Sequence, residues 1–195
     1  MIYVVTNRKL AKNKDLLGCV EKVLEYGACS VILREKDLGY DELYEIAQKI
    51  KFITDKHSAK LIVNGSLRVA EEVKAYAYHS SFVNFINNGG SKIIKNGVSI
   101  HSLEEAKRAE ENGADYILAG NIYETACKPG LKGRGLEFVS CISQNITIPE
   151  IAIGGISEGN VQELINSGAN GAAVMSSAMK NPAVIKKIIE KINNK

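Results

Sequence analysis

The sequence predicts an α/β protein in which all 195 residues form one (β/α)8 TIM barrel with a shortened fourth unit. Short β-branched runs alternate along the chain with amphipathic segments. The runs are apolar on both faces, as in the covered strands of a parallel sheet. No linker interrupts this pattern, so residues 1–195 are expected to be a single domain. An open doubly wound sheet is the alternative, although the early glycine-rich dinucleotide fingerprint is absent.

The strands are expected where β-branched residues cluster between segments with helical spacing of apolar residues. Two weaker signals, at 80–85 and 97–101, bring the strand signals to the number that a closed barrel needs. The clear strands are expected at 2–6, 29–35, 60–65, 116–120, 149–155 and 170–176.

Glycines mark the joints between the expected helices and strands. Gly27, Gly113 and Gly168 each precede an alanine at such a joint, where a left-handed residue can end a helix. The stretch 78–97 is polar and rich in glycine and asparagine. It shows no convincing helix, so a shortened fourth unit with a mobile loop is expected there.

Composition excludes several classes of protein. The formal net charge is only +3 and no helix-turn-helix pattern occurs, so nucleic acid is not an expected partner. No apolar stretch reaches the ~18 residues of a membrane span, and the N-terminus lacks the order of a signal peptide. The four cysteines form no CxxC pair. We therefore expect a cytoplasmic protein with reduced thiols and no membrane partner.

Two apolar runs near the end of the chain finish in small residues. Gly154 and Gly155 follow one expected strand, and Ser176 and Ser177 follow the next. In a (β/α)8 barrel the last two strand ends often hold a phosphate, because small residues let backbone N–H groups approach an anion closely. The pattern predicts a phosphate site, and tight turns between strand and helix are the alternative.

Charged and polar residues follow two other strands. Arg34 is expected to point into the mouth of the barrel if Ile32 points inward, because alternate strand residues share a face. The long polar loop 120–135 carries Thr125, Lys128 and several glycines. It is interpreted as a flap over the mouth, against the alternative of a solvated loop without a role.

The motifs "VILREK", "GVSIHSLEEAKRAEENGADYILAGNIYETACKPGLKGRGL", "IPEIAIGGIS" and "GANGAAVMSS" resemble the thiamine phosphate synthase/TenI superfamily. The run "ETACKPGLKGRG" is similar to the TenI branch in particular. The resemblance implies a barrel that binds a small thiazole phosphate, and it permits a homodimer. By family position, Lys128 and Thr125 would face the thiazole ring or its carboxylate, and Asn64 and Ser99 would line the mouth. A buried turn serine is the alternative for Ser99.

Departures from the family pattern argue against the synthase reaction, which couples a thiazole phosphate to a pyrimidine pyrophosphate with Mg²⁺. The family's Asn-Asp pair is Asn64-Gly65 here, its "HLGQxD"-like run has no equivalent near 78–85, and its glutamine before "LREK" is Ile32. Mg²⁺ is usually held by one or two carboxylates. The sequence therefore predicts no metal site and no cofactor.

The TenI resemblance implies a tautomerase that aromatises carboxythiazole phosphate by a 1,3-proton shift. The histidine that performs this step in the family is Asn121 here, and an amide exchanges no proton near neutral pH. Cys127 and His101 are the candidate substitutes, against packing or capping roles. Three functions stay open: an altered thiazole tautomerase, an atypical thiamine phosphate synthase, and a thiazole-phosphate sensor without catalysis.

Overall fold

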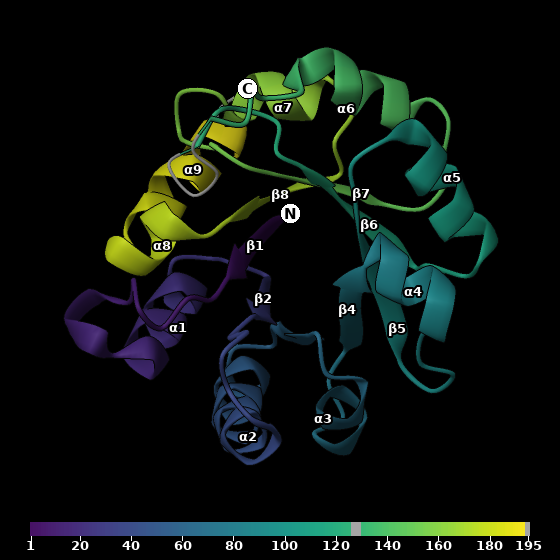
Figure 1. The fold of residues 1–195 in the computed structure, drawn as a ribbon. Coiled ribbons are helices and arrows are strands. Elements are labelled where there is room, and N and C mark those ends of the chain that lie inside the picture. The colour runs from purple at the N-terminus through teal and green to yellow at the C-terminus, as the bar shows by residue number, and fades with distance from the viewer. Residues whose placement is uncertain (126–129, 194–195) are drawn as a thin grey trace.

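The computed structural model describes residues 1–125 and 130–193. Within these residues a closed barrel of parallel strands runs in the order β1 to β8, with β8 paired back onto β1. Helices surround the barrel (Figure 1), as the sequence predicts. The strands are β1 (Ile2–Val5), β2 (Ser30–Leu33), β3 (Lys60–Asn64), β4 (Ala77–Ser81), β5 (Lys95–Ile100), β6 (Tyr116–Gly120), β7 (Glu150–Ile153) and β8 (Gly171–Val174).

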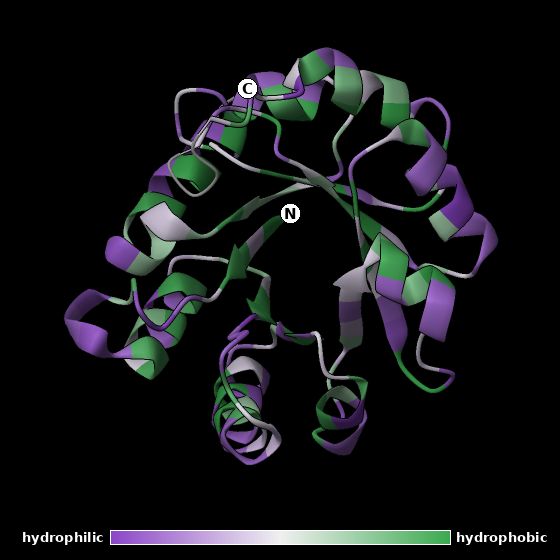
Figure 2. Ribbon diagram, in the orientation of Figure 1, coloured by the Kyte–Doolittle hydropathy of each residue, from purple (hydrophilic) through white to green (hydrophobic). Residues whose placement is uncertain are grey.

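The helices follow their strands in the alternation expected of this fold. α1, α2, α5 and α6 are amphipathic and bury one side against the strands, and Figure 2 shows hydrophobic and hydrophilic residues alternating along them. The helices are the 3₁₀ turn η1 (Lys12–Lys14), α1 (Leu16–Glu25), α2 (Tyr40–Lys56), α3 (Leu67–Glu72), α4 (Phe82–Asn88), α5 (Leu103–Glu111), α6 (Gly135–Ser143), α7 (Val161–Asn166), α8 (Ser176–Lys180) and α9 (Val184–Asn193).

Buried side chains form an interior layer and an outer layer. Tyr3, Ile32, Ile62 and Ile151 belong to the layer inside the barrel, and the larger cluster fills the space between strands and helices. This division follows from the alternation of strand residues between two faces. It also sets the expected register, since Ile32 points inward and Arg34, two residues later, lines the mouth.

The fourth unit corrects one prediction. The strand expected over 80–85 is wrong: β4 ends at Ser81, and Phe82–Asn88 forms helix α4. Ser81 starts this helix by accepting a hydrogen bond from the Asn84 N–H, and Phe85 anchors it in the core. At seven residues α4 is not shorter than the six-residue helices α3 and α7.

The glycines at the helix-to-strand joints have the predicted backbone. Gly27, Gly113 and Gly168 have φ angles of 99°, 87° and 109°. In the described ranges, no helix combines the length and the apolar character needed to cross a bilayer.

Candidate functional site

A cavity of about 1180 Å³ opens at the carboxyl ends of the strands. This is the end at which a TIM barrel holds its functional loops. The structure brings together at this cavity all of the predicted site residues that it describes. They are Arg34, Asn64, Ser99, His101, Asn121, Thr125, Gly154, Gly155, Ser176 and Ser177.

One wall of the cavity, the corner wall, consists of residues 154–156 and 176–177. The backbone N–H groups of these residues donate no hydrogen bond to any residue that the structure describes. Gly154 has a φ of 109°, and a Cβ atom there would lie 2.6 Å from Cβ of Asn121. Glycine is therefore required for the chain to turn at this point. The corner wall therefore offers N–H groups that can donate hydrogen bonds to an anion.

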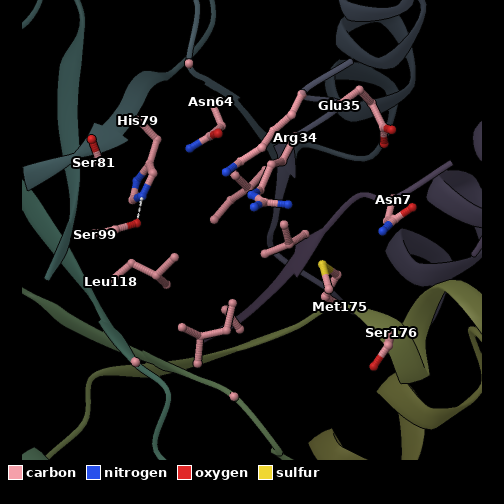
Figure 3. Close-up of a pocket in the computed structure, with 18 of the residues that line it drawn as sticks. Asn7, Arg34, Glu35, Asn64, His79, Ser81, Ser99, Leu118, Met175 and Ser176 are labelled. Carbon is pink, nitrogen blue, oxygen red and sulfur yellow. Dashed lines mark hydrogen bonds between the residues drawn. The ribbon is translucent and has the colours of Figure 1, made fainter. Parts of the chain in front are cut away.

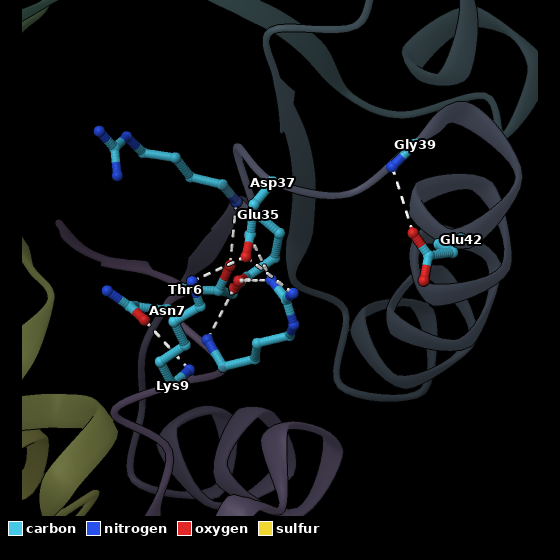
Figure 4. A network of polar contacts seen from close by, with 9 residues as sticks. Thr6, Asn7, Lys9, Glu35, Asp37, Gly39 and Glu42 are labelled. Carbon is cyan, nitrogen blue, oxygen red and sulfur yellow. Dashed lines mark hydrogen bonds and ion pairs between the residues drawn. The ribbon is translucent and has the colours of Figure 1, made fainter.

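A polar network fixes the loops that follow β1 and β2 (Figure 4). Glu35 accepts hydrogen bonds from the Arg8 backbone N–H at 2.9 Å and from its guanidinium at 3.2 Å. Arg8 also pairs with Asp37 at 2.6 Å, and Arg8 and then Lys9 hold the pKa of that carboxyl well below its usual range. The Arg34 N–H donates to Oγ1 of Thr6. The Glu35 carboxylate is thereby engaged by Arg8, while the Arg34 side chain extends toward Asn64 and His79 (Figure 3).

The charged residues lining the cavity are mostly cationic. Arg34, Lys36 and Lys180 line it, and the single lining carboxylate in the described chain, Glu35, is paired with Arg8. Such a lining attracts anions. It does not suit Mg²⁺, which proteins usually bind through one or two carboxylates. Across residues 1–125 and 130–193, no three His, Cys, Asp or Glu side chains are grouped so that they could hold a metal ion.

The opposite wall, the side-chain wall, comes from β4, β5 and β6. His79 is buried, and its ring nitrogens lie 2.9 Å from the Tyr116 hydroxyl and 2.8 Å from Oγ of Ser99. Burial, and after it the nearby Arg34 charge, lowers the pKa of His79 to about 3. This imidazole is therefore neutral at physiological pH.

His101 lies just beyond β5 in a different environment. Its Nδ1 is 2.7 Å from the carbonyl oxygen of Gly120. A carbonyl can only accept, so Nδ1 carries the hydrogen and Nε2 keeps a free lone pair. The same carbonyl accepts a hydrogen bond from Arg134 at 3.3 Å, which ties the end of β6 to the loop that follows it. The side chain of His101 is exposed at the cavity, and Nε2 has no partner within the described residues.

Asn121 is only 2% exposed and lines the cavity beside His101. Its amide nitrogen donates to the Tyr123 carbonyl at 3.3 Å, and its Oδ1 is buried without a partner in the described chain. A buried acceptor of this kind is normally satisfied by a water molecule or a ligand.

Two predicted site residues, Cys127 and Lys128, lie outside the described residues. Three residues of the site were missed in the sequence: His79, Tyr116 and Lys180. The signal that could have found His79 is its place two residues after Ala77 on one inward-facing row of β4, which a correct end of that strand would have revealed.

The closed barrel and its anion-attracting mouth define a TIM-barrel protein of the kind that holds small ligands at its carboxyl-terminal face. A family model described as thiamine monophosphate synthase matches residues 2–178. The chain therefore belongs to this family, whose members serve thiamine biosynthesis.

Named relatives agree with this assignment. The thiamine-phosphate synthase of Clostridium tetani is 37% identical over 182 residues, which are 91% of this chain and 87% of that protein. The thiamine-phosphate synthase of Clostridium acetobutylicum is 38% identical over 184 residues, 91% of this chain and 86% of that protein. The solved thiamine phosphate pyrophosphorylase of Pyrococcus furiosus has a TM-score of 0.85 and 30% identity, covering 98% of this chain and 94% of that one.

Proposed function

We propose that this protein binds a thiazole phosphate at the mouth of the barrel, with the phosphate on the corner wall. The observation that carries the proposal is the set of unpaired N–H groups at 154–156 and 176–177, next to a cavity whose free charges are cationic. Lys180, on the helix α8 that begins at Ser176, adds positive charge to the cavity. Backbone donors and cations together suit a doubly charged phosphate ester.

We further propose that the reaction is the aromatisation of carboxythiazole phosphate by a proton shift, with His101 as the acid/base. A 1,3-shift takes a proton from one position of the thiazole and returns it to another, so it is redox-neutral and needs no second reactant. His101 can accept that proton at Nε2, because Gly120 holds the hydrogen on Nδ1. His79 is unsuited to this role, because both of its nitrogens are occupied and burial disfavours its charged form.

The names of the relatives favour a second candidate, thiamine-phosphate synthase. That reaction also uses a thiazole phosphate, so the phosphate site serves both candidates. The donor set of the described cavity does not fit the Mg²⁺ that the family's synthase reaction uses, because its one carboxylate is bound to Arg8. For this reason we rank the synthase second.

Two assays on one purified sample separate the candidates. The first follows aromatisation of carboxythiazole phosphate in D2O by NMR, where a proton shift through the enzyme leaves deuterium in the product. The second supplies the decarboxylated thiazole phosphate, the pyrimidine pyrophosphate and Mg²⁺, and measures thiamine phosphate. Product in the first assay alone supports the tautomerase, and product in the second supports the synthase. If calorimetry detects binding of neither thiazole phosphate, the proposed function is wrong.

The role of His101 has its own test. His101→Gln should lower the aromatisation rate by about 10²- to 10⁴-fold and change ligand affinity little, since only proton transfer is removed. His57→Gln is the matched control, because His57 ends α2 and does not line the cavity. Asn121→His should raise the rate by about 10²-fold if a second imidazole can act there. Equal rates in wild type and His101→Gln would assign the proton to another group.

A further inference from the structure

A chain of hydrogen bonds runs from the barrel interior to the cavity through three strands. Tyr116 on β6 contacts Nδ1 of His79 on β4, and Nε2 of His79 contacts Oγ of Ser99 on β5. Gly97 makes this chain possible. It pairs with both His79 and Tyr116 in the sheet, and a Cβ atom at this position would overlap the Tyr116 hydroxyl. Glycine is therefore the residue that leaves room for the phenol to reach the imidazole.

The direction of these hydrogen bonds follows from the number of hydrogens. Neutral His79 carries one N–H, and Tyr116 and Ser99 carry one O–H each, so three hydrogens serve two contacts. In one arrangement Tyr116 donates to Nδ1, the Nε2 hydrogen is donated to Ser99, and the Ser99 hydrogen is left over. In the other, Ser99 donates to Nε2, the Nδ1 hydrogen is donated to Tyr116, and the Tyr116 hydrogen is left over.

Burial decides between the two arrangements. Tyr116 is 5% exposed, and within the described residues its hydroxyl has one hydrogen-bond partner, His79. A hydrogen left over there would be buried without an acceptor, at a cost of about 1–3 kcal/mol. Ser99 is half-buried and lines the cavity, where solvent or a ligand can accept its hydrogen. The arrangement that leaves the Ser99 hydrogen free is therefore the stable one.

We infer that Tyr116 and His79 are positioning residues that fix Ser99 as a hydrogen-bond donor to the ligand. Figure 3 shows His79 bonded to Ser99 at the edge of the cavity, with Arg34 and Asn64 reaching into the same space. The Ser99–His79 contact has the spacing of a nucleophile and its base. His79 cannot act as the base for Ser99, because its Nε2 already carries a hydrogen and has no lone pair to accept the serine proton.

The side-chain wall consequently recognises an acceptor atom at the end of the ligand opposite its phosphate. Ser99 and the guanidinium of Arg34 offer donors there, and the described cavity has no free carboxylate that would compete for them. This step rests on the proposed function: if the ligand is carboxythiazole phosphate, the acceptor is its carboxylate. The wall would then distinguish the carboxylated from the decarboxylated thiazole phosphate.

The tautomer of His79 can be read without any ligand. Nitrogen-15 NMR of the full-length protein distinguishes an imidazole protonated on Nε2 from one protonated on Nδ1, and His57→Gln and His101→Gln assign the remaining signal. We expect the Nε2–H form in wild type. In Tyr116→Phe the Nδ1–H form of His79 should become populated. Tyr3→Phe, a matched change of another tyrosine inside the barrel, should keep the Nε2–H form. An Nδ1–H form in wild type would overturn the inference.

Binding measurements test the contact with the ligand. Ser99→Ala should weaken calorimetric affinity for the carboxylated thiazole phosphate by about 10-fold or more and leave affinity for the decarboxylated one nearly unchanged. Ser99→Thr, which keeps the hydroxyl, should restore most of the loss. Equal affinities of Ser99→Ala and wild type for the carboxylated ligand would refute the donor role. If wild type binds neither compound, the proposed function fails, while the NMR result still decides the role of Tyr116 and His79.

Discussion

The two walls of the cavity are built from different parts of the chain. The corner wall at 154–156 and 176–177 presents backbone N–H groups, and apart from Ile156 its side chains are small or absent. The side-chain wall presents an imidazole and hydroxyls that three strands bring together. A backbone site depends on the path of the chain, whereas a side-chain site depends on strand register. Substitutions should therefore damage the two walls in different ways.

The largest expected effect on ligand affinity comes from adding one methyl group to the corner wall. In Gly154→Ala the new Cβ would lie 2.6 Å from Cβ and 2.8 Å from Cα of Asn121, so the backbone must move. We expect affinity for carboxythiazole phosphate to fall at least about 100-fold, because misplaced N–H groups no longer reach one phosphate. Isothermal titration calorimetry measures this loss.

Gly113→Ala provides the control for backbone conformation alone. Gly113 has a φ of 87°, but a Cβ atom there meets nothing within 4 Å. This variant should lose about 1–2 kcal/mol of stability and keep its ligand affinity. If Gly154→Ala behaves in the same way, the corner wall does not hold the phosphate.

The difference between the walls also explains what the sequence could predict. Gly154, Gly155, Ser176 and Ser177 can be identified from residue type alone, since small residues at the last two strand ends leave the backbone accessible. Arg34 can be placed at the mouth because it lies two residues after the inward-facing Ile32, and alternate strand residues share a face. The strand and helix pattern predicted the closed barrel for the same reason, because it depends on local periodicity.

The side-chain wall could not be predicted in this way. His79 lies on β4, whose pale and purple colouring in Figure 2 reflects a strand with few hydrophobic residues. Such a strand gives a weak periodic signal, and the predicted strand at 80–85 therefore ends later than β4, which ends at Ser81. The contact between His79 and Tyr116 joins residues 37 positions apart and depends on Gly97 between them. No spacing in the sequence encodes a contact of this kind.

Glu150 is a buried carboxyl group that belongs to neither wall, so a change there should affect stability and not ligand affinity. Glu150 begins β7, at the end of the strand opposite the cavity, and it is fully buried with both oxygens unpartnered in the described chain. Burial raises its pKa to about 8, above the value of 4.5 expected in the unfolded chain. The folded state then binds the extra proton between these values, so wild-type stability is lost as pH rises from about 4.5 to 8.

Glu150→Gln should remove this loss, because the amide stays neutral. We expect the variant to gain on the order of 3 kcal/mol over wild type between pH 5 and pH 8, measured by denaturant unfolding at both values. Ligand affinity should not change, since Glu150 does not line the cavity. The exposed Glu163→Gln is the control. A parallel pH dependence in Glu150→Gln and wild type would show that Glu150 ionises normally.

The smallest expected effect on ligand affinity comes from removing a hydroxyl of the corner wall. If the phosphate is held by the backbone, Ser176→Ala removes at most one side-chain hydrogen bond and should weaken affinity by less than about 10-fold, or roughly 0.5–1.5 kcal/mol. Ser177→Ala removes the neighbouring hydroxyl on the same helix turn, and it is compared with Ser176→Ala in the same calorimetric titration. A loss in Ser176→Ala as large as that in Gly154→Ala would mean that side chains bind the phosphate. The corner wall would then have to be regarded, like the wall from β4 to β6, as a site made of side chains.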